Sequence, residues 1–258
     1  MKKEKLTIII LSCVLALETI LVAWLMVGRA RVIKKPVQAV KGKIAIVLDD
    51  WGYNLNNLAV LEEIRSPLTL SILPNLAFSQ NVAQAGHAKG FEIILHLPMQ
   101  PRENTSLERN TILVSMEDRF IGEIVDHDLD NIVYARGVSN HMGSRATADM
   151  RVMRAVFKEL KKKQVYFLDS FVSYNSVCPF LAHQMKLKTA RRDIFLDNNE
   201  DPSYIREQLN KLKLRSLAKG EAIGIGHDKK NTLLVLKEMM PILEKEGYKF
   251  VFVSELVK

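Results

Sequence analysis

Residues 44–54, IAIVLDDWGYN, run from five apolar residues directly into two adjacent carboxylates, Asp49 and Asp50. A short continuous apolar run bounded by turn residues is typical of a strand buried on both faces, and such strands occur mainly in parallel sheets covered by helices. The carboxylates therefore come at the carboxyl end of a strand, where ligands bind in α/β folds. The alternative is a turn in which one Asp caps the following helix.

The rest of the chain alternates short apolar runs with longer amphipathic segments. Further strands are predicted at residues 68–73, 91–95, 132–138, 165–168, 187–190, 222–225 and 248–253, with helices between most of them. This alternation indicates βαβ units and a parallel sheet. Because there are seven or eight repeats and no Gly-rich phosphate loop, we expect an α/β fold of the distorted (β/α) barrel type, with about seven parallel strands.

The formal charge of +8 lies almost entirely in the first 43 residues. Nine Lys/Arg and two Glu there account for +7, and 28 Lys/Arg against 27 Asp/Glu leave +1 for residues 44–258. That larger part has no basic stripe with interleaved aromatic side chains, so nucleic acid is not expected as a partner.

The basic start is followed by 22 mostly apolar residues, 6–27, which as a helix would span about 33 Å. This predicts one N-terminal transmembrane helix that serves as a signal anchor, because the run exceeds the apolar part of an ordinary cleaved signal peptide. Glu18 lies inside the span, either as a tolerated acid of a single anchor or facing a partner helix. Basic residues flank both ends of the span, so charge alone does not decide which side the domain occupies.

The expected organisation is a membrane anchor at residues 1–30, a basic tether at 31–43 and one barrel domain at 44–258. A chain of this length can bury one substantial core. Cys13 falls in the span and Cys178 is alone in the domain, so no disulfide partner is evident.

Polar residues follow nearly every predicted strand. They are Asp49, Asp50, Asn75, His96, Asn140, His141, Asp169, Ser170, Arg192, Asp193 and His227. Because the carboxyl ends of parallel strands meet at one mouth of a barrel, this set supplies the ligands and acid–base groups of a metal hydrolase. The other histidines, His87, His127 and His183, fall on polar faces of predicted helices and are expected at the surface.

A catalytic metal needs three protein ligands and an open position for water. Asp50, His96 and His141 are the predicted ligands of a divalent metal, with zinc as the expected ion. Asp49 is then free to act as general base, and His227 can protonate the leaving group. Each histidine also has a structural interpretation, as a core residue bonding a carbonyl (His96), a turn cap (His141) or a loop residue (His227).

Six ordered motifs resemble those of a known family. They are AIVLDDWGYN, ILHLPMQP, GVSNHMGSRAT, FLDSFVSYNSV, RDIFLDN and AIGIGHD. Together they resemble the motif set of the divergent polysaccharide deacetylase family, a branch of the carbohydrate deacetylase superfamily whose domain is a distorted (β/α) barrel. The resemblance covers nearly all of residues 44–258.

The resemblance implies roles for three residues. In the superfamily the first Asp of the pair is the base and the second is a metal ligand, which corresponds here to Asp49 and Asp50. The Leu-x-His motif of the last strands is similar to residues 225–227, IGH, and this makes His227 the acid.

The chain departs from the family pattern at the histidine ligands. A His-x-x-x-His motif supplies both of them in the superfamily, whereas here His96 is followed by Gln100 at the second position, where the divergent branch often has Glu. The second nitrogen ligand is therefore sought in His141.

Two functions follow from these residues. One is a metal-dependent hydrolase that removes acetyl groups from an envelope polysaccharide or related glycan, with Asn140 stabilising the oxyanion. Ser144, Asp169, Ser170 and Arg192 are further candidates for substrate binding. The other function is a catalytically inactive barrel that binds a glycan or a cell-envelope partner. Because similar proteins are exported, the resemblance implies a membrane-anchored domain that faces the periplasm or the cell exterior.

Overall fold

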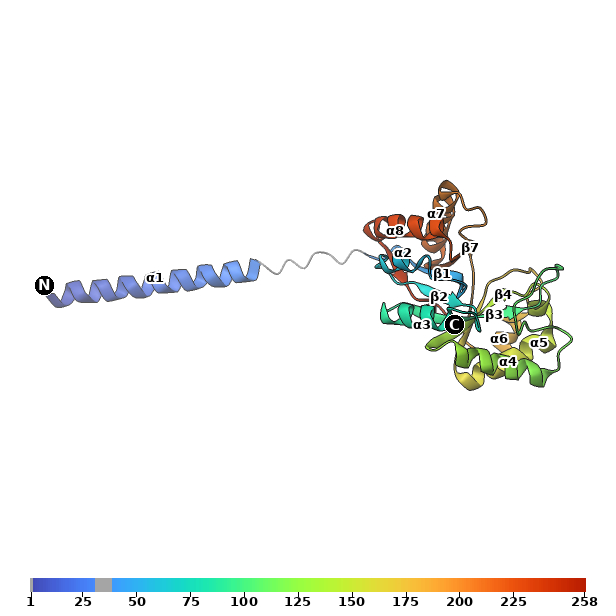
Figure 1. Ribbon diagram of the computed structural model, residues 1–258. Helices are drawn as coiled ribbons and strands as arrows, with labels where there is room; N and C mark the ends of the chain where they lie inside the picture. The colour runs from blue at the N-terminus through green and yellow to red at the C-terminus, as the bar shows by residue number, and fades with distance from the viewer. Residues whose placement is uncertain (1, 31–38) are drawn as a thin grey trace. The chain divides into compact units, whose positions relative to one another are not determined.

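The computed structural model describes residues 2–30 and 39–258, and contacts divide the chain into two compact units, Met1–Ala39 and Val40–Lys258. The first unit contains helix α1, Lys2–Ala30 (Figure 1). Its stretch Lys2–Leu25 is long and apolar enough to cross a membrane. A helix of this kind near the N-terminus is either an anchor or a signal sequence. Of the predicted basic tether, residues 31–38 lie outside the described residues.

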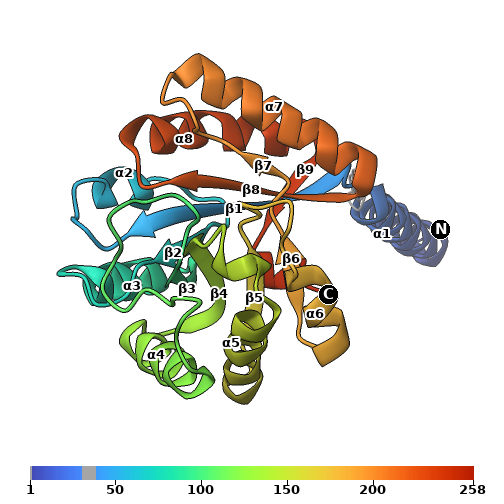
Figure 2. The same cartoon turned by 90° about the vertical axis from the view of Figure 1, so that its right-hand side faces the viewer.

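The second unit is built of parallel strands with helices around them. The strands are β1 (Gly42–Trp51), β2 (Thr69–Ile72), β3 (Glu92–Met99), β4 (Ala135–Met142), β5 (Tyr166–Asp169), β6 (Thr189–Arg191), β7 (Ile194–Phe195), β8 (Glu221–His227) and β9 (Tyr248–Val251). The helices are α2 (Leu58–Glu62), α3 (Ser79–Ala88), α4 (Asp118–Asn131), α5 (Met150–Lys163), α6 (Cys178–Met185), α7 (Pro202–Lys219) and α8 (Lys230–Lys245). Figure 2 shows helices α2 to α8 on the outside of the strands.

The strands follow the order β6-β5-β4-β3-β2-β1-β8-β7, and β9 pairs with the first residues of β1. Every ladder is parallel. No ladder joins β6 to β7 within the described residues, so the eight-strand path is a half-barrel rather than a closed ring. The predicted α/β class and distorted barrel are confirmed.

Alternate residues of β1 face two different apolar layers. Ile44, Ile46 and Leu48 pack in the layer between strands and helices, whereas Ala45 and Val47 belong to the smaller cluster inside the barrel. The inward series continues to Asp49, which is 2 % exposed. The core of the barrel thus leads directly to a carboxylate at its carboxyl-end mouth.

The other end of the barrel is closed by a buried polar cluster. Glu92 Oε2 accepts hydrogen bonds from Thr69 Oγ1 at 2.7 Å and from the Tyr166 hydroxyl at 3.0 Å. These three residues lie on β2, β3 and β5, so the cluster ties the strands together at the end away from the aspartates.

Strands β3 and β4 extend further than predicted. Their ladder continues from His96 opposite Ser139 to Met99 opposite Met142. His96 and His141 therefore lie within strands, not in the turns that follow them. The predicted strands end at Leu95 and Val138, each followed by a polar residue, but backbone pairing does not require an apolar side chain on the barrel interior.

Candidate metal centre and active site

The two aspartates lie at an irregularity in β1. Leu48 pairs with Leu70 and Trp51 with Ile72, so β1 has one residue more than β2 between these pairs, which makes a β-bulge. Asp50 has a φ of 65°, in the left-handed region that few non-glycine residues adopt. In a regular strand adjacent side chains point to opposite faces. The bulge lets both carboxylates approach the same imidazole.

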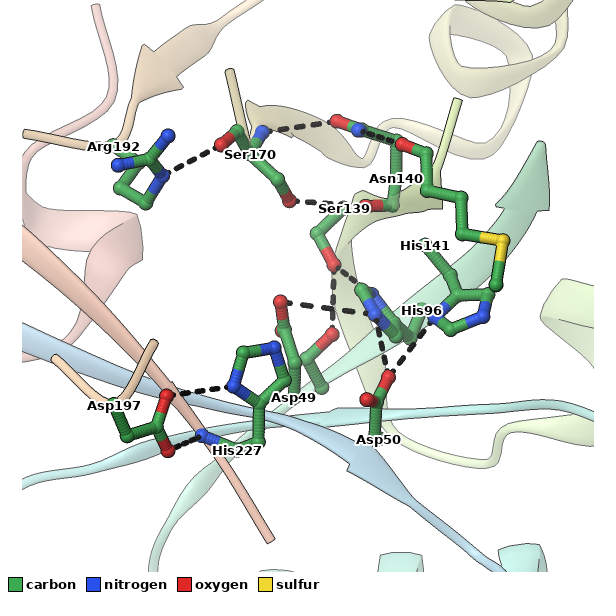
Figure 3. Close-up of polar contacts among 12 residues, drawn as sticks. Asp49, Asp50, His96, Ser139, Asn140, His141, Ser170, Arg192, Asp197 and His227 are labelled. Carbon is green, nitrogen blue, oxygen red and sulfur yellow. Dashed lines mark hydrogen bonds and ion pairs between the residues drawn. The ribbon is translucent and has the colours of Figure 1, made fainter. Parts of the chain in front are cut away.

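Asp50, His96 and His141 come together at the mouth of the barrel. Asp50 Oδ1 lies 3.2 Å from His96 Nε2 and 2.9 Å from His141 Nδ1. One ligand atom from each residue lies within 4.8 Å of the others. Figure 3 shows the two imidazoles pointing at the same carboxylate. The structure thus brings together the three predicted ligands.

This donor set fits a divalent metal. One carboxylate and two imidazoles are a common protein ligand set for catalytic zinc. His96 Nδ1 lies 2.8 Å from Ser139 Oγ, and a proton donated there leaves the lone pair on Nε2, facing Asp50. On the other imidazole, Nδ1 of His141 faces Asp50, and Nε2 is buried with no hydrogen-bond partner among residues 2–30 and 39–258.

A chain of buried hydroxyls joins the metal-ligand candidates to the predicted base. Ser139 Oγ lies 2.7 Å from Ser71 Oγ, and Ser71 is hydrogen-bonded to Asp49. Both serines are fully buried. Neither was predicted from the sequence, because a serine at an inward barrel position interrupts the apolar pattern without marking a strand end.

The two adjacent carboxylates have opposite pKa shifts. Burial raises the pKa of Asp49, the charge of Asp50 raises it further, and nearby groups such as His96 offset this only in part. Burial also acts upward on Asp50, but the hydrogen bonds from His141 and His96 outweigh it and hold the pKa of Asp50 well below its usual range. Asp50 is therefore suited to remain an anion beside a cation, and Asp49 to accept a proton.

His227 lies beside the carboxylates and is held by Asp197. His227 Nδ1 is 2.7 Å from Asp197 Oδ1, and the His227 backbone N–H donates to Oδ2 at 2.8 Å. Burial alone would lower the pKa of His227, but Asp197, with smaller effects from Asp49 and Asp50, raises it to about 8. His227 also pairs with Asp49 across the β1–β8 ladder. The raised pKa favours the protonated imidazole at neutral pH, next to the predicted base.

Asp197 is a candidate functional residue that the sequence pattern did not reveal. It directly follows Leu196, after the two-residue strand β7, which is too short to produce a recognisable pattern. Its carboxylate is 1 % exposed, and the hydrogen bond from His227 holds its pKa low against the effect of burial. The available signal was its place in the motif RDIFLDN.

Two of the predicted substrate-binding residues bond to one another. Asn140 Oδ1 accepts from the Ser170 N–H at 2.9 Å, and Ser170 Oγ donates to the Asn140 carbonyl at 3.0 Å. The Asn140 amide also donates to the Met142 carbonyl at 2.7 Å. These bonds tie the end of β4 to the end of β5.

Three further predicted residues hold loops around the mouth. Asp169 accepts from the Phe171 N–H at 2.8 Å and from Ser176 Oγ at 2.7 Å. Ser144 Oγ accepts from the Arg102 N–H at 2.8 Å and donates to the Glu103 carboxylate at 3.0 Å. Arg192 donates to two backbone carbonyls of the loop after β5, Ser170 O at 2.7 Å and Phe171 O at 2.8 Å.

Gln100 also has a defined structural task. Its Oε1 accepts from the Val114 N–H at 2.8 Å, and its backbone N–H donates to the Ile112 carbonyl at 2.9 Å. The side chain at the second position of the family's histidine motif therefore fastens the long loop between β3 and α4. It is not part of the Asp50, His96 and His141 group.

The barrel domain is similar to known proteins. The sequence model for divergent polysaccharide deacetylases matches residues 46–257. The uncharacterized protein YibQ of Escherichia coli (strain K12) is 34% identical over 208 residues, which are 81% of this chain and 65% of that protein. The matched region therefore spans less than two thirds of that relative's length.

Two solved structures show how widely the fold is shared. An uncharacterized protein from Agrobacterium tumefaciens C58 superimposes with a TM-score of 0.79 at 22% identity, over 86% of this chain and 91% of that one. A family 4 carbohydrate esterase from Streptomyces lividans, in complex with acetate, has a TM-score of 0.56 at 12% identity, over 82% and 93%. At these identities the likeness concerns the fold alone.

Proposed function

The chain belongs to the divergent polysaccharide deacetylase family, and from this premise we propose that its barrel domain is a metal-dependent hydrolase that removes acetyl groups from an envelope polysaccharide or related glycan. The observation that supports this most is the convergence of Asp50, His96 and His141 beside Asp49 and His227. A carbohydrate esterase that binds acetate on the same fold adds support.

Asp50, His96 and His141 would hold the divalent metal, which we propose to be zinc. When bound, such a metal polarises the acetyl carbonyl and lowers the pKa of water. Ser139 fixes the ring of His96, and the low pKa of Asp50 keeps its carboxylate ionised over the working pH range.

Asp49 and His227 would divide the proton transfers between them. Asp49 takes a proton from the attacking water, because its carboxylate is buried, its Oδ1 has no hydrogen-bond partner among the described residues, and its pKa is raised. His227 donates a proton to the departing sugar nitrogen or oxygen, because its pKa of about 8 keeps it protonated at neutral pH. Asp197 orients that imidazole and stabilises its charge.

Arg192 is our candidate for direct contact with the glycan, because it lies close enough to Asp49 for the two charges to interact and is drawn in the same region as Asp49 and His227 (Figure 3). Asn140, Ser144, Asp169 and Ser170 bond to strand ends and loops. We therefore assign them the shaping of the substrate cleft.

Helix α1 would anchor the protein in a membrane, with the barrel domain on the periplasmic or outer side. The support is the length and apolar character of Lys2–Leu25. The helix would keep the domain close to the glycans of the cell envelope.

The proposal is tested by acetate release from a panel of N- and O-acetylated glycans, using the full chain in detergent with added zinc. Asp49→Asn and His227→Gln should each lower the rate by about 100-fold or more, because each removes one proton-transfer group. His183→Gln, on helix α6, is the matched control and should leave the rate unchanged. A native protein that binds zinc and glycan but releases no acetate from any substrate would favour the inactive binding barrel instead.

A further inference from the structure

Two consecutive arginines beside the site each lie over an aromatic ring. Arg191 Cζ is 4.3 Å from the centroid of Phe171, and Arg192 Cζ is 3.6 Å from the centroid of Phe195. Within the part of the chain that the structure describes, neither guanidinium forms an ion pair with a carboxylate. Stacking leaves the edges of a guanidinium free to bind an anion.

Arg192 is held in one orientation. Its Nε and Nη2 donate to the carbonyls of Ser170 and Phe171, and the Asp169 carboxylate fixes the Phe171 N–H of the same loop. Nη1 takes part in neither of these bonds. A rigid donor loses little conformational entropy when it binds a ligand, so this nitrogen is prepared for recognition.

The same loop exposes an aromatic side chain. Tyr174 is 95% exposed, and its ring lies edge-on to Phe171 with centroids 5.6 Å apart. Its ring is therefore not part of a core, although its loop is fastened by several hydrogen bonds. The electron-rich face of an aromatic ring attracts the C–H groups of a sugar ring.

These residues adjoin the candidate catalytic groups. Phe195 stacks on His227 with centroids 5.9 Å apart and planes 20° from parallel. Arg192 lies close enough to Asp49 for the two charges to interact. Figure 3 shows Arg192 beside Ser170, in the same region as Asp49 and His227. A glycan bound at Asp49 would therefore lie close to these residues.

We infer that Phe171, Tyr174, Arg191, Arg192 and Phe195, the arginine–aromatic ledge, form a subsite for an acidic glycan, in which a sugar ring stacks on Tyr174 and a carboxylate binds Arg192. A planar carboxylate matches the planar guanidinium, and the carboxylates of Asp169 and Asp49, whose charges act on Arg192, form no ion pair with it among the described residues. The inference rests on the proposed function, which supplies the reaction. It adds that the glycan substrate is negatively charged.

The test is a binding titration of the full chain in detergent with EDTA present, so that metal and turnover do not influence the result. The probes are a chitin tetrasaccharide, which is neutral, and a hyaluronan tetrasaccharide, in which N-acetylglucosamine alternates with glucuronate. The native protein should bind the acidic probe about tenfold more tightly or better, as one charged hydrogen-bonded contact allows. This preference should shrink as salt is raised.

Substitutions separate charge recognition from loop support. Arg192→Gln should abolish the preference, with a larger loss of affinity for the acidic probe than for the neutral one. Arg192→Lys, which keeps the charge, should retain part of the preference.

Tyr174→Ala should weaken the binding of both probes, since it removes only stacking. Arg65→Gln removes an exposed charge that precedes β2, at the other end of the barrel, and should change neither. A thermal melt of each variant checks its fold.

Equal affinity for both probes, or no binding of the acidic one, would overturn the inference. An equal loss for both probes in a folded Arg192→Gln protein would do the same, because it would leave Arg192 only the support that it gives to the loop carbonyls of Ser170 and Phe171. A charge preference without acetate release would refute the proposed reaction alone. Acetate release without a preference would refute only the acidic subsite.

Discussion

At the scale of single residues, the proton on His227 depends on Asp197. The folded-state pKa of about 8 lies above the ordinary value of 6.5. The stabilisation of the fold by this pair is therefore fully present below pH 6.5 and is lost as the pH rises through about 8. Acetate release that uses His227 as acid should decline over the same alkaline range.

Asp197→Asn should move that decline to lower pH by about one unit or more, because it removes the counter-charge while the burial of His227 remains. The measurements are a pH–rate profile and an NMR titration of the His227 ring. Thr232→Val, which removes a hydroxyl bonded to Asp197, is the control and should shift the pKa much less. If the alkaline side of the pH–rate profile is unchanged in Asp197→Asn, this would contradict the proposed effect of Asp197 on His227.

Ser139 acts on the candidate metal through His96. Ser139→Ala should weaken zinc binding by about 10- to 100-fold, because it removes the group that fixes the His96 ring. Isothermal titration with zinc measures the change. Ser144→Ala is the matched control, since that hydroxyl holds only the outer loop, and equal affinities in the two variants would argue against the orienting role.

The sequence was sufficient to nominate residues with metal-binding or acid–base chemistry that closely follow an apolar run. Asp50, His96 and His141 were predictable because at most two polar residues separate each of them from the end of an apolar run. Ser71, Ser139 and Asp197 were not, because their importance comes from neighbours on other strands. A hydroxyl inside a barrel or a carboxylate after a two-residue strand has no local pattern.

At the scale of elements, β4 carries Ser139 and His141 and must lie close to β5. A methyl group added to Gly137 would meet Tyr166 ring carbons at 2.4 Å. Gly137→Ala should therefore lower the free energy of unfolding by roughly 2 to 4 kcal/mol, since the buried ring has a fixed hydrogen bond to Glu92.

Chemical denaturation measures this loss. Gly122→Ala in helix α4 is the matched control, because its methyl group meets only the Glu159 carboxylate at 3.7 Å and alanine favours a helix. It should be neutral or stabilising. Equal melting of Gly137→Ala and the native protein would show that β4 and β5 can move apart.

The alternation of short apolar runs with amphipathic segments was sufficient to predict most strands and helices and the barrel. The predicted and observed strands differ where backbone pairing, not the pattern of side chains, determines where a strand ends. The β3–β4 ladder continues past His96, the bulge at Asp49 and Asp50 depends on the register with β2, and β7 exists through pairing with β8.

At the scale of the whole molecule, the long apolar helix is distinct from the barrel domain in sequence and in contacts. Removal of residues 1–39 should release the protein from the membrane fraction after an alkaline wash and leave the melting temperature of the barrel unchanged. Sedimentation and a thermal melt of both proteins test this. A full chain that is found cleaved and soluble would identify the helix as a signal sequence instead.

The most direct test of the central claim is the metal content and zinc affinity of the full chain beside His96→Ala and His141→Ala, with His87→Ala as a surface control. We predict one metal per native chain, retained in His87→Ala and lost in both other variants while all four proteins stay folded. A native protein that binds no metal after zinc addition, or variants that bind it as tightly, would contradict the assignment of Asp50, His96 and His141.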